Sequence, residues 1–455
     1  MTLTEELAEW ALGLTPAKLP WHVRRAARRH LLDGLGTTVA AGRAGMVRPV
    51  TVVATGLGGP GEATVLGTGE RVSAPAAALA TGALVHALDF DDTHAGGLVH
   101  ATAAVLPALL AVGEQVDAYG EEALVVAVAG YETVCRVAAA APHAFHARGL
   151  HATMACGVFA AALVAARLMR LDQRRTVDAL GIAGSQAGGL LEFLATGAST
   201  KQLHPGLAAY SGILAARLAA AGADGPASVL EGANGLYAAL AGGRGDPAAV
   251  VTDLGRRWET TRIGLKPYPA CQLVHSTLDA GARAIAAGPL AVDDVAAVRV
   301  FVHPDSAPIV CGPGKAEPRT AYDAKFSLPW SLAALLVDGT VTPATYGADS
   351  LARPHLRTLA ARVVVVVTEP DGVAADAPGR VEVDLAGGGR LVGTVERSAG
   401  GPDNPLDDLA FDDKLAGNVG SADAAARLTK AVHAAVPVSE LVALVDELAH
   451  PEEDR

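Results

Sequence analysis

Residues 379–400 read GRVEVDLAGGGRLVGTVERSAG, two stretches of alternating apolar and polar residues joined by a glycine turn. Such alternation predicts half-buried β-strands, and the three consecutive glycines predict a hairpin turn. The segments VAAVRVFVHPDSA (295–307) and ARVVVVVTEP (361–370) also favour strands. We therefore expect an antiparallel sheet within residues 295–400. Segments 320–339 and 349–360 have helical patterns, so this region is predicted to be an α+β unit.

The chain on both sides of this unit is patterned for helices. Apolar residues recur at three- and four-residue spacing in segments 121–141, 157–169, 207–221, 422–436 and 438–450. The glycine-rich segment 50–70 is instead expected to be a loop with a short extended piece. The predicted fold is mainly α: a large all-helical domain, residues 1–265 plus 405–455, with a smaller α+β domain, residues 266–404, inserted before the tail.

Composition excludes several classes of protein. The chain has 455 residues, of which 51% are hydrophobic and 18% charged, enough for a large buried core. No apolar run reaches the roughly 20 residues that a membrane helix needs, so no membrane partner is expected. The net charge of −12 argues against a nucleic-acid partner. The acidic, amphipathic start has no secretion signal, which indicates a cytoplasmic protein.

One segment concentrates titratable residues in an apolar context: GALVHALDFDDTHAGGLVHATAAVLPAL, residues 82–109. A helix over residues 83–93 would place His86, Asp89 and either Asp92 or Thr93 on one face. Burying unpaired carboxylates is costly, so such a cluster either faces solvent or belongs to a site.

Three chemistries could use this cluster. A metal could bind Asp, Asp and His, but the other polar segments offer Lys and His rather than more carboxylates. The four cysteines stand alone, with no spacing for zinc, an iron–sulfur cluster or a disulfide framework. The Asp-rich pattern also resembles class II terpene cyclases, whose cation-stabilising aromatic pockets do not suit a chain with 4% aromatic residues. Acid–base chemistry on an anionic small molecule remains as the third.

The other polar segments favour the third chemistry. Each lies in a turn or before an apolar helix, where backbone N–H groups attract anions. Taken singly, each residue also has an ordinary structural explanation as a helix cap, an exposed turn residue or a buried core histidine. The residues are His151 in ARGLHATMACG, Lys201 and His204 in STKQLHPG, and Lys266, Cys271 and His275 in KPYPACQLVHSTLDA.

Together the motifs HALDFDDTH, STKQLHPG, KPYPACQLVHSTLDA and AKFSLPWSLAALLVDG resemble the MmgE/PrpD family over nearly the whole chain. That family includes 2-methylcitrate dehydratase, cis-aconitate decarboxylase and iminodisuccinate epimerase. The resemblance implies a helical domain with a smaller α+β lid domain, an active site between them, and a homodimer. It also implies small di- or tricarboxylate substrates and no metal or other cofactor.

Carried onto this sequence, the resemblance assigns catalytic roles to Asp89, His100, His151, Lys201 and Lys266. A second set is expected to contact substrate: Thr93, His86, His204, Cys271, His275 and Trp330. In that scheme the lysines and histidines stabilise the enolate-like charge that develops when an α-proton or CO2 leaves, and a neutral His acts as base.

Two positions depart from the decarboxylase branch of the family. Cys271 stands where that branch has a His, and Trp330 stands where it has a Tyr. We therefore expect a cofactor-free lyase or isomerase, with dehydration of a 2-methylcitrate-like hydroxy acid as the leading reaction. Decarboxylation, epimerisation and double-bond isomerisation, by a family member recruited to a biosynthetic pathway, are the alternatives within the family. A catalytically silent helical assembly protein is the alternative outside it, and it predicts that the polar segments do not converge.

Overall fold

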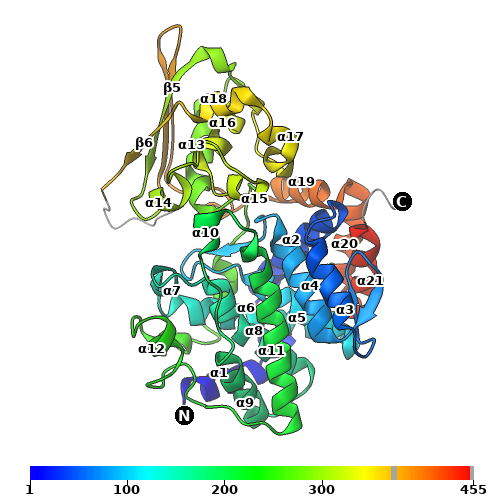
Figure 1. Ribbon diagram of the computed structural model, residues 1–455. Helices are drawn as coiled ribbons and strands as arrows, with labels where there is room; N and C mark the ends of the chain where they lie inside the picture. Colours follow the sequence, from blue (N-terminus) through cyan, green and yellow to red (C-terminus); the bar gives the residue numbers. More distant parts are fainter. Residues whose placement is uncertain (370–376, 451–455) are drawn as a thin grey trace.

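The computed structural model describes residues 1–369 and 377–450, and it is mainly helical (Figure 1). The ends of the predicted segments 361–370 and 405–455 fall outside these ranges. The longer helices before residue 265 are α1 (Leu3–Leu12), α2 (Trp21–Arg43), α3 (Arg48–Leu57), α4 (Ala74–Ala87), α5 (Ala101–Gln115), α6 (Gly120–Ala139), α8 (Ala152–Leu168), α9 (Gln173–Gly184) and α11 (His204–Ala221). The predicted helices at 121–141, 157–169 and 207–221 are confirmed as α6, α8 and α11.

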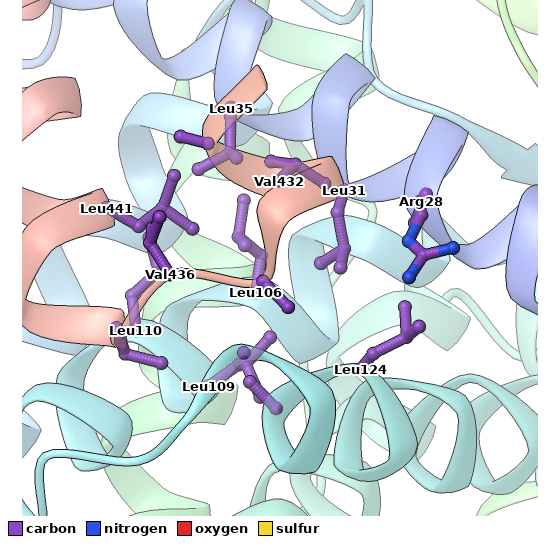
Figure 2. A pocket seen from close by; sticks show the side chains of 15 residues that line it. Arg28, Leu31, Leu35, Leu106, Leu109, Leu110, Leu124, Val432, Val436 and Leu441 are labelled. Carbon is purple, nitrogen blue, oxygen red and sulfur yellow. The ribbon is translucent and has the colours of Figure 1, made fainter. Parts of the chain in front are cut away.

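The C-terminal helices return to the N-terminal part of the chain. They are α19 (Asp408–Val419), α20 (Ala422–Ala434) and α21 (Val438–Ala449), and they pack beside α2 (Figure 1). Figure 2 shows where they meet it: Leu31 of α2, Leu106 of α5, Val432 of α20 and Leu441 of α21 surround a small apolar cavity of about 40 Å³. One hydrophobic core therefore contains residues from 7–265 and from 411–449.

A second hydrophobic core lies within residues 270–395. Its sheet has the strand order β6-β5-β7-β8, formed by β5 (Val295–Val302), β6 (Val363–Val367), β7 (Gly379–Leu385) and β8 (Arg390–Val395). The helix α13 (His275–Ala284) packs on β7 and β8, and α16 (Leu328–Asp338) packs on α13 and on α18 (Pro354–Ala360). The side chain of Ser327 caps α16, and Gly339 ends it at φ 75°.

The expectation of a wholly antiparallel sheet is wrong. The β7–β8 hairpin and the β5–β7 pair are antiparallel, but β6 pairs with β5 in parallel. The chain between β5 and β6 contains α16 and α18, and such a helical crossover lets the second strand run in the same direction as the first.

Two local predictions also need correction. Segment 50–70 is helical as far as Leu57 before it forms the short strands β1 (Ala63–Val65) and β2 (Glu70–Val72). The helix predicted over residues 83–93 ends at Ala87, because Asp89 takes a left-handed conformation with φ 52° and the chain then forms strand β3 (Thr93–His94). The polar residues of this segment therefore lie on a turn rather than along one helix face.

The helices α4 and α11 cross closely. Along the chain, the crossing point on α4 comes shortly before Asp89, and the crossing point on α11 comes shortly after Lys201. A Cβ added to Gly206 of α11 would collide with the carbonyl oxygen of Leu79, and one added to Gly82 of α4 would collide with the backbone of Gly206. Glycine at both positions lets the two backbones touch. This contact fixes the distance between the Asp89 turn, which follows α4, and the Lys201 turn, which precedes α11.

We expect Gly206→Ala to lower the free energy of unfolding by about 1–3 kcal/mol, because the added methyl overpacks this crossing. Gly417→Ala in α19 is the matched control, since its Cβ would have no neighbour within 4 Å among the described residues and alanine favours helix by up to about 1 kcal/mol. Urea denaturation measures both. Equal stability of the two variants would contradict a tight crossing.

Candidate active site

Asp89 is the centre of the polar cluster. Its carboxylate is completely buried, and Oδ1 accepts hydrogen bonds from Nζ of Lys201 at 3.0 Å and Nζ of Lys266 at 2.6 Å. Lys266 also donates to the backbone carbonyl of Asp89 at 2.9 Å. Burial alone would raise the pKa of Asp89, but the two ammonium groups outweigh it and hold this pKa well below its usual value. The three side chains form a charged triad with two cations on one anion.

Three histidine rings lie next to this triad. The ring centroids of His86 and His100 are 4.5 Å apart, and those of His86 and His151 are 5.7 Å apart. Burial lowers the pKa of all three rings, and the charge of Lys201 contributes to the lowering. The rings are therefore neutral at physiological pH, the state in which a histidine can accept a proton.

Hydrogen bonds fix the tautomer of His100. Its Nδ1 lies 2.9 Å from the carbonyl oxygen of Asp92, which can only accept, so Nδ1 carries the proton. The lone pair of Nε2 then faces Nζ of Lys201 at 3.4 Å. Lys201 thus connects Asp89 to a neutral imidazole nitrogen, a geometry in which a proton can be exchanged between the ammonium group and the ring.

His151 presents the other ring nitrogen of interest. Its Nδ1 lies 3.0 Å from Nδ1 of His204, and its Nε2 is buried without a hydrogen-bond partner among the described residues. His151 begins α8 and also lines the main cavity. A buried nitrogen without a hydrogen bond is energetically costly unless a bound molecule or water supplies one. Nε2 of His151 is therefore a candidate contact for a ligand.

These groups meet at a cavity of about 740 Å³. It is lined from the helical part of the chain and from the sheet-bearing part, and α10 (Phe193–Thr196) and α14 (Ala307–Val310) lie at this junction (Figure 1). Six predicted site residues line it: Asp89, Thr93, His100, His151, Lys201 and Cys271. The segments that carry these residues are far apart in the sequence, but the fold brings them together around one cavity.

Three more predicted residues lie behind the lining. Lys266 contacts Asp89, His86 contacts Asp91 through Nδ1 at 2.8 Å, and His204 contacts His151. The charges of Asp89 and Asp91 raise the pKa of Lys266 although burial opposes this.

Two residues that were predicted to contact substrate lie away from the cavity lining. Trp330 is completely buried in the second hydrophobic core, where its indole N–H donates to the carbonyl of Thr345. His275 is also fully buried, and its Nε2 donates to the carbonyl of Ala270. Both side chains point into packed structure rather than into the cavity, because they belong to the first turn of a helix whose apolar face forms the core.

Cys271 lines the cavity as predicted, but it is not an activated thiol. Burial raises the pKa of Cys271, and the nearby carboxylate of Asp89 raises it further. The neutral, protonated thiol of this position is a small apolar group in the cavity wall.

Several contributing residues were not predicted. Lys325 is buried and donates to the carbonyls of Leu88 at 2.7 Å and Pro269 at 3.2 Å, so it ties the turn of Asp89 to the turn of Cys271. Burial lowers the pKa of Lys325 to about 7. The motif AKFSLPW contains this lysine next to an apolar helix, which was the available signal.

A buried polar network supports the turn from below. Lys414 of α19 donates to the carbonyl of Phe90 at 2.9 Å and pairs with Asp33 of α2 at 2.5 Å. Asp92 accepts from the backbone N–H of Thr102 at 2.9 Å, and burial raises the pKa of Asp92 to about 7. Helix α19, near the C-terminus, therefore helps to hold Phe90 and the Asp89 turn beside the cavity.

Two overlapping groups could hold a metal ion by geometry: His86, His100 and His151, and His86, Asp89, Asp91 and His100, with candidate ligand atoms within 4.8 Å of one another. Both groups contain His100, whose Nε2 already faces Nζ of Lys201, whereas Nε2 of His86, Nε2 of His151 and Oδ2 of Asp89 are buried without a partner among the described residues. Lys201 donates to Asp89 and faces Nε2 of His100, while His86 donates to Asp91. A divalent cation would have to displace an ammonium group, so this donor set fits a metal poorly.

Comparison with known proteins decides the family. Residues 5–247 match the MmgE/PrpD N-terminal domain, and residues 268–436 match the MmgE/PrpD C-terminal domain. The chain belongs to the MmgE/PrpD family. This family membership, expected from the motifs around Asp89, Lys201 and Lys266, is confirmed.

Several relatives in this family have names that state an activity. A cis-aconitate decarboxylase of Aspergillus terreus (strain NIH 2624 / FGSC A1156) is 29% identical over 420 residues, 88% of this chain and 85% of that protein. The cis-aconitate decarboxylase-like protein oryM of Aspergillus oryzae (strain ATCC 42149 / RIB 40) is 30% identical over 358 residues, 74% of each chain. The cis-aconitate decarboxylase of Homo sapiens is 28% identical over 378 residues, 80% of this chain and 76% of that one.

No helix within the described ranges is both long enough and apolar enough to span a membrane.

We expect Asp89→Asn to lower the free energy of unfolding by about 3–5 kcal/mol at pH 7, because it leaves two buried ammonium groups without their carboxylate. Asp413→Asn, at an exposed position of α19, is the matched control and should have little effect. Chemical denaturation followed by circular dichroism measures both. A loss below about 1 kcal/mol for Asp89→Asn would contradict a charged triad.

The buried neutral histidines predict a loss of stability in mild acid. Burial lowers the pKa of His30 to about 4, below the value near 6.5 of an unfolded chain. Its contribution is fully present above pH 6.5 and is lost as the pH falls toward 4, because the unfolded state then binds the extra proton. His30→Gln should reduce the fall in unfolding free energy between pH 6.5 and 4, whereas His22→Gln, at an exposed position, should leave it unchanged.

Proposed function

We propose that this protein is a lyase that acts on a carboxylate without a metal or other cofactor, through an enolate-like charge on the carbon next to a carboxylate. The observation that carries the proposal is the position of Lys201, whose ammonium group lies on the cavity wall between ionised Asp89 and neutral His100. A buried cation at this position would stabilise negative charge that develops on the substrate.

The proposed roles follow from the protonation states. Lys201 binds a substrate carboxylate and, with His100, moves a proton. His151 lines the cavity, its Nε2 has no hydrogen-bond partner among the described residues, and it acts as the second proton acceptor or donor. Lys266 does not line the cavity, and its role is to keep Asp89 ionised so that Asp89 orients Lys201. His275 and Trp330, which do not line the cavity, receive no role.

Decarboxylation and dehydration place the same demands on this site. In decarboxylation the C–CO2 bond breaks, its electron pair stays on carbon, and a proton from Lys201 or a histidine then binds that carbon. In dehydration a neutral histidine removes the α-proton, and hydroxide leaves as water after it receives a proton from the acid. In both reactions a cation near the substrate carboxylate lowers the cost of the intermediate charge.

Among these reactions we rank decarboxylation ahead of the dehydration expected from the sequence, and the names of the relatives support this order. One of the two arguments against decarboxylation also loses its force, because Trp330 does not reach the cavity. Dehydration of a 2-methylcitrate-like acid is kept as the second candidate, since Cys271 does line the cavity in place of the histidine of the decarboxylase branch.

The remaining expectations are proposals of the same kind. We place a helical domain at residues 1–265 plus 405–455 and a lid domain at 266–404; the two separate hydrophobic cores and the cavity lined from both support this division. A homodimer in the cytoplasm is proposed from the family resemblance. Convergence of the polar segments on one cavity argues against a silent assembly protein.

The test is proton NMR in D2O of protein treated with a chelator, with 2-methylcitrate, citrate, cis-aconitate and related C5 to C7 acids. We expect loss of an α-proton signal or a new vinyl signal, and Lys201→Ala should slow it by about 10²-fold or more. Lys430→Ala, at an exposed position of α20, should retain full activity. Activity that survives in Lys201→Ala, or that depends on added metal, would contradict the proposal.

A further inference from the structure

The cavity has an apolar wall besides its polar groups. This apolar wall consists of Leu191, Phe193, Leu194, Leu273, Ile309 and Phe326. Phe193 and Phe326 pack edge to face with ring centroids 6.0 Å apart, and Leu191, Leu194, Cys271 and Ile309 pack against them. The proposed catalytic mechanism assigns no role to any of these side chains. Together they form an apolar surface that a purely anionic ligand would leave exposed to water.

The charges around the cavity nearly cancel. Among the described lining residues the charged ones are Asp89, Lys201 and Asp305, and no arginine is present. Lys266 lies behind Asp89, and Lys325, whose pKa burial lowers to about 7, donates to backbone carbonyls beside it; the buried carboxylates of Asp89 and Asp91 offset these lysines. Burial lowers the pKa values of His86, His100 and His151, so these three rings are neutral. A ligand with three carboxylates would find little uncompensated positive charge here.

The volume of the cavity also favours a ligand larger than a small tricarboxylate. A C6 tricarboxylate has about a dozen non-hydrogen atoms, and even at roughly the 30 Å³ that one water molecule takes in the liquid they would fill only about half of the cavity. The volume of about 740 Å³ is typical of sites that bury larger, partly apolar ligands.

We infer that the substrate is a mono- or dicarboxylate with an alkyl or alkenyl chain, whose carboxylate end contacts Lys201 and His151 and whose chain covers the apolar wall. The inference rests on the proposed function, because it names the class of acid on which that chemistry acts. The polar groups perform the reaction and the apolar wall selects the chain.

The first experiment measures binding of unreactive acids to the full-length protein by titration calorimetry. The probes are succinate, its 2-methyl, 2-butyl and 2-hexyl derivatives, and propane-1,2,3-tricarboxylate. We expect the affinity to rise about three- to fourfold for each added methylene until the cavity is full. The tricarboxylate should bind more weakly than 2-butylsuccinate. Affinity that is independent of chain length, or highest for the tricarboxylate, would overturn the inference.

A matched pair of variants locates the chain. Leu194→Arg places a cation on the apolar wall, so it should remove the gain in affinity with chain length and strengthen binding of the tricarboxylate. Leu190→Arg adds the same charge four residues earlier, at a side chain that is 67% exposed and outside the cavity lining, and should bind like the unmodified protein. Unchanged chain-length dependence in Leu194→Arg would overturn the placement of the chain.

Failure of the inference and failure of the proposed function give different results. Proton exchange or product formation with a tricarboxylate in NMR, together with no benefit from an alkyl chain, would overturn the substrate class and leave the lyase chemistry standing. Chain-dependent binding without exchange or turnover of any acid, including unsaturated or hydroxylated alkyl acids, would support the binding site and contradict the lyase. Absence of both would overturn the two proposals together.

Discussion

The pairing of one buried carboxylate with two buried ammonium groups is the constraint on which the site depends. The charge of Asp89 raises the pKa of buried Lys266, and the ammonium groups of Lys201 and Lys266 hold the pKa of buried Asp89 well below its usual value. The triad also dictates backbone shape. Because Asp89 must receive lysines from two other segments, the chain leaves α4 in a left-handed turn instead of continuing as helix.

The triad in turn sets the state of the groups around it. Its lysines help to keep His86, His100 and His151 neutral, and Lys201 faces the lone pair of His100. Lys325 and Lys414 then tie the adjoining backbone carbonyls of Leu88 and Phe90 to other parts of the chain. Each cation therefore satisfies a carboxylate or a carbonyl that the fold has buried, and together they hold the Asp89 turn rigid.

Sequence periodicity predicted the helices α6, α8, α11, α20 and α21 and the β7–β8 hairpin, because those elements depend on local residue patterns. It could not predict that β6 pairs with β5 in parallel, since register and direction are decided by how α16 and α18 return the chain to the sheet. The motifs led to Asp89, His100, His151, Lys201 and Lys266, which the structure brings together. They also pointed to Trp330 and His275, which lie buried away from the cavity lining, because the sequence does not reveal which face of a helix's first turn packs into the core. Lys325 was missed because its partners are main-chain carbonyls, which leave no sequence signature.

The two kinds of cavity wall come from different kinds of element. Lys201 lies in the turn that precedes α11, and His204 begins this helix, whose glycine crossing with α4 permits little movement. Phe193, Leu194 and Ile309 belong instead to α10 and α14, which have four residues each. Short helices at the surface tolerate substitution better than a close helix crossing does. Mutation can therefore remodel the shape of the cavity while the acid–base groups stay in register. This separation offers a physical route by which descendants of one ancestral scaffold acquire new substrates without losing their chemistry.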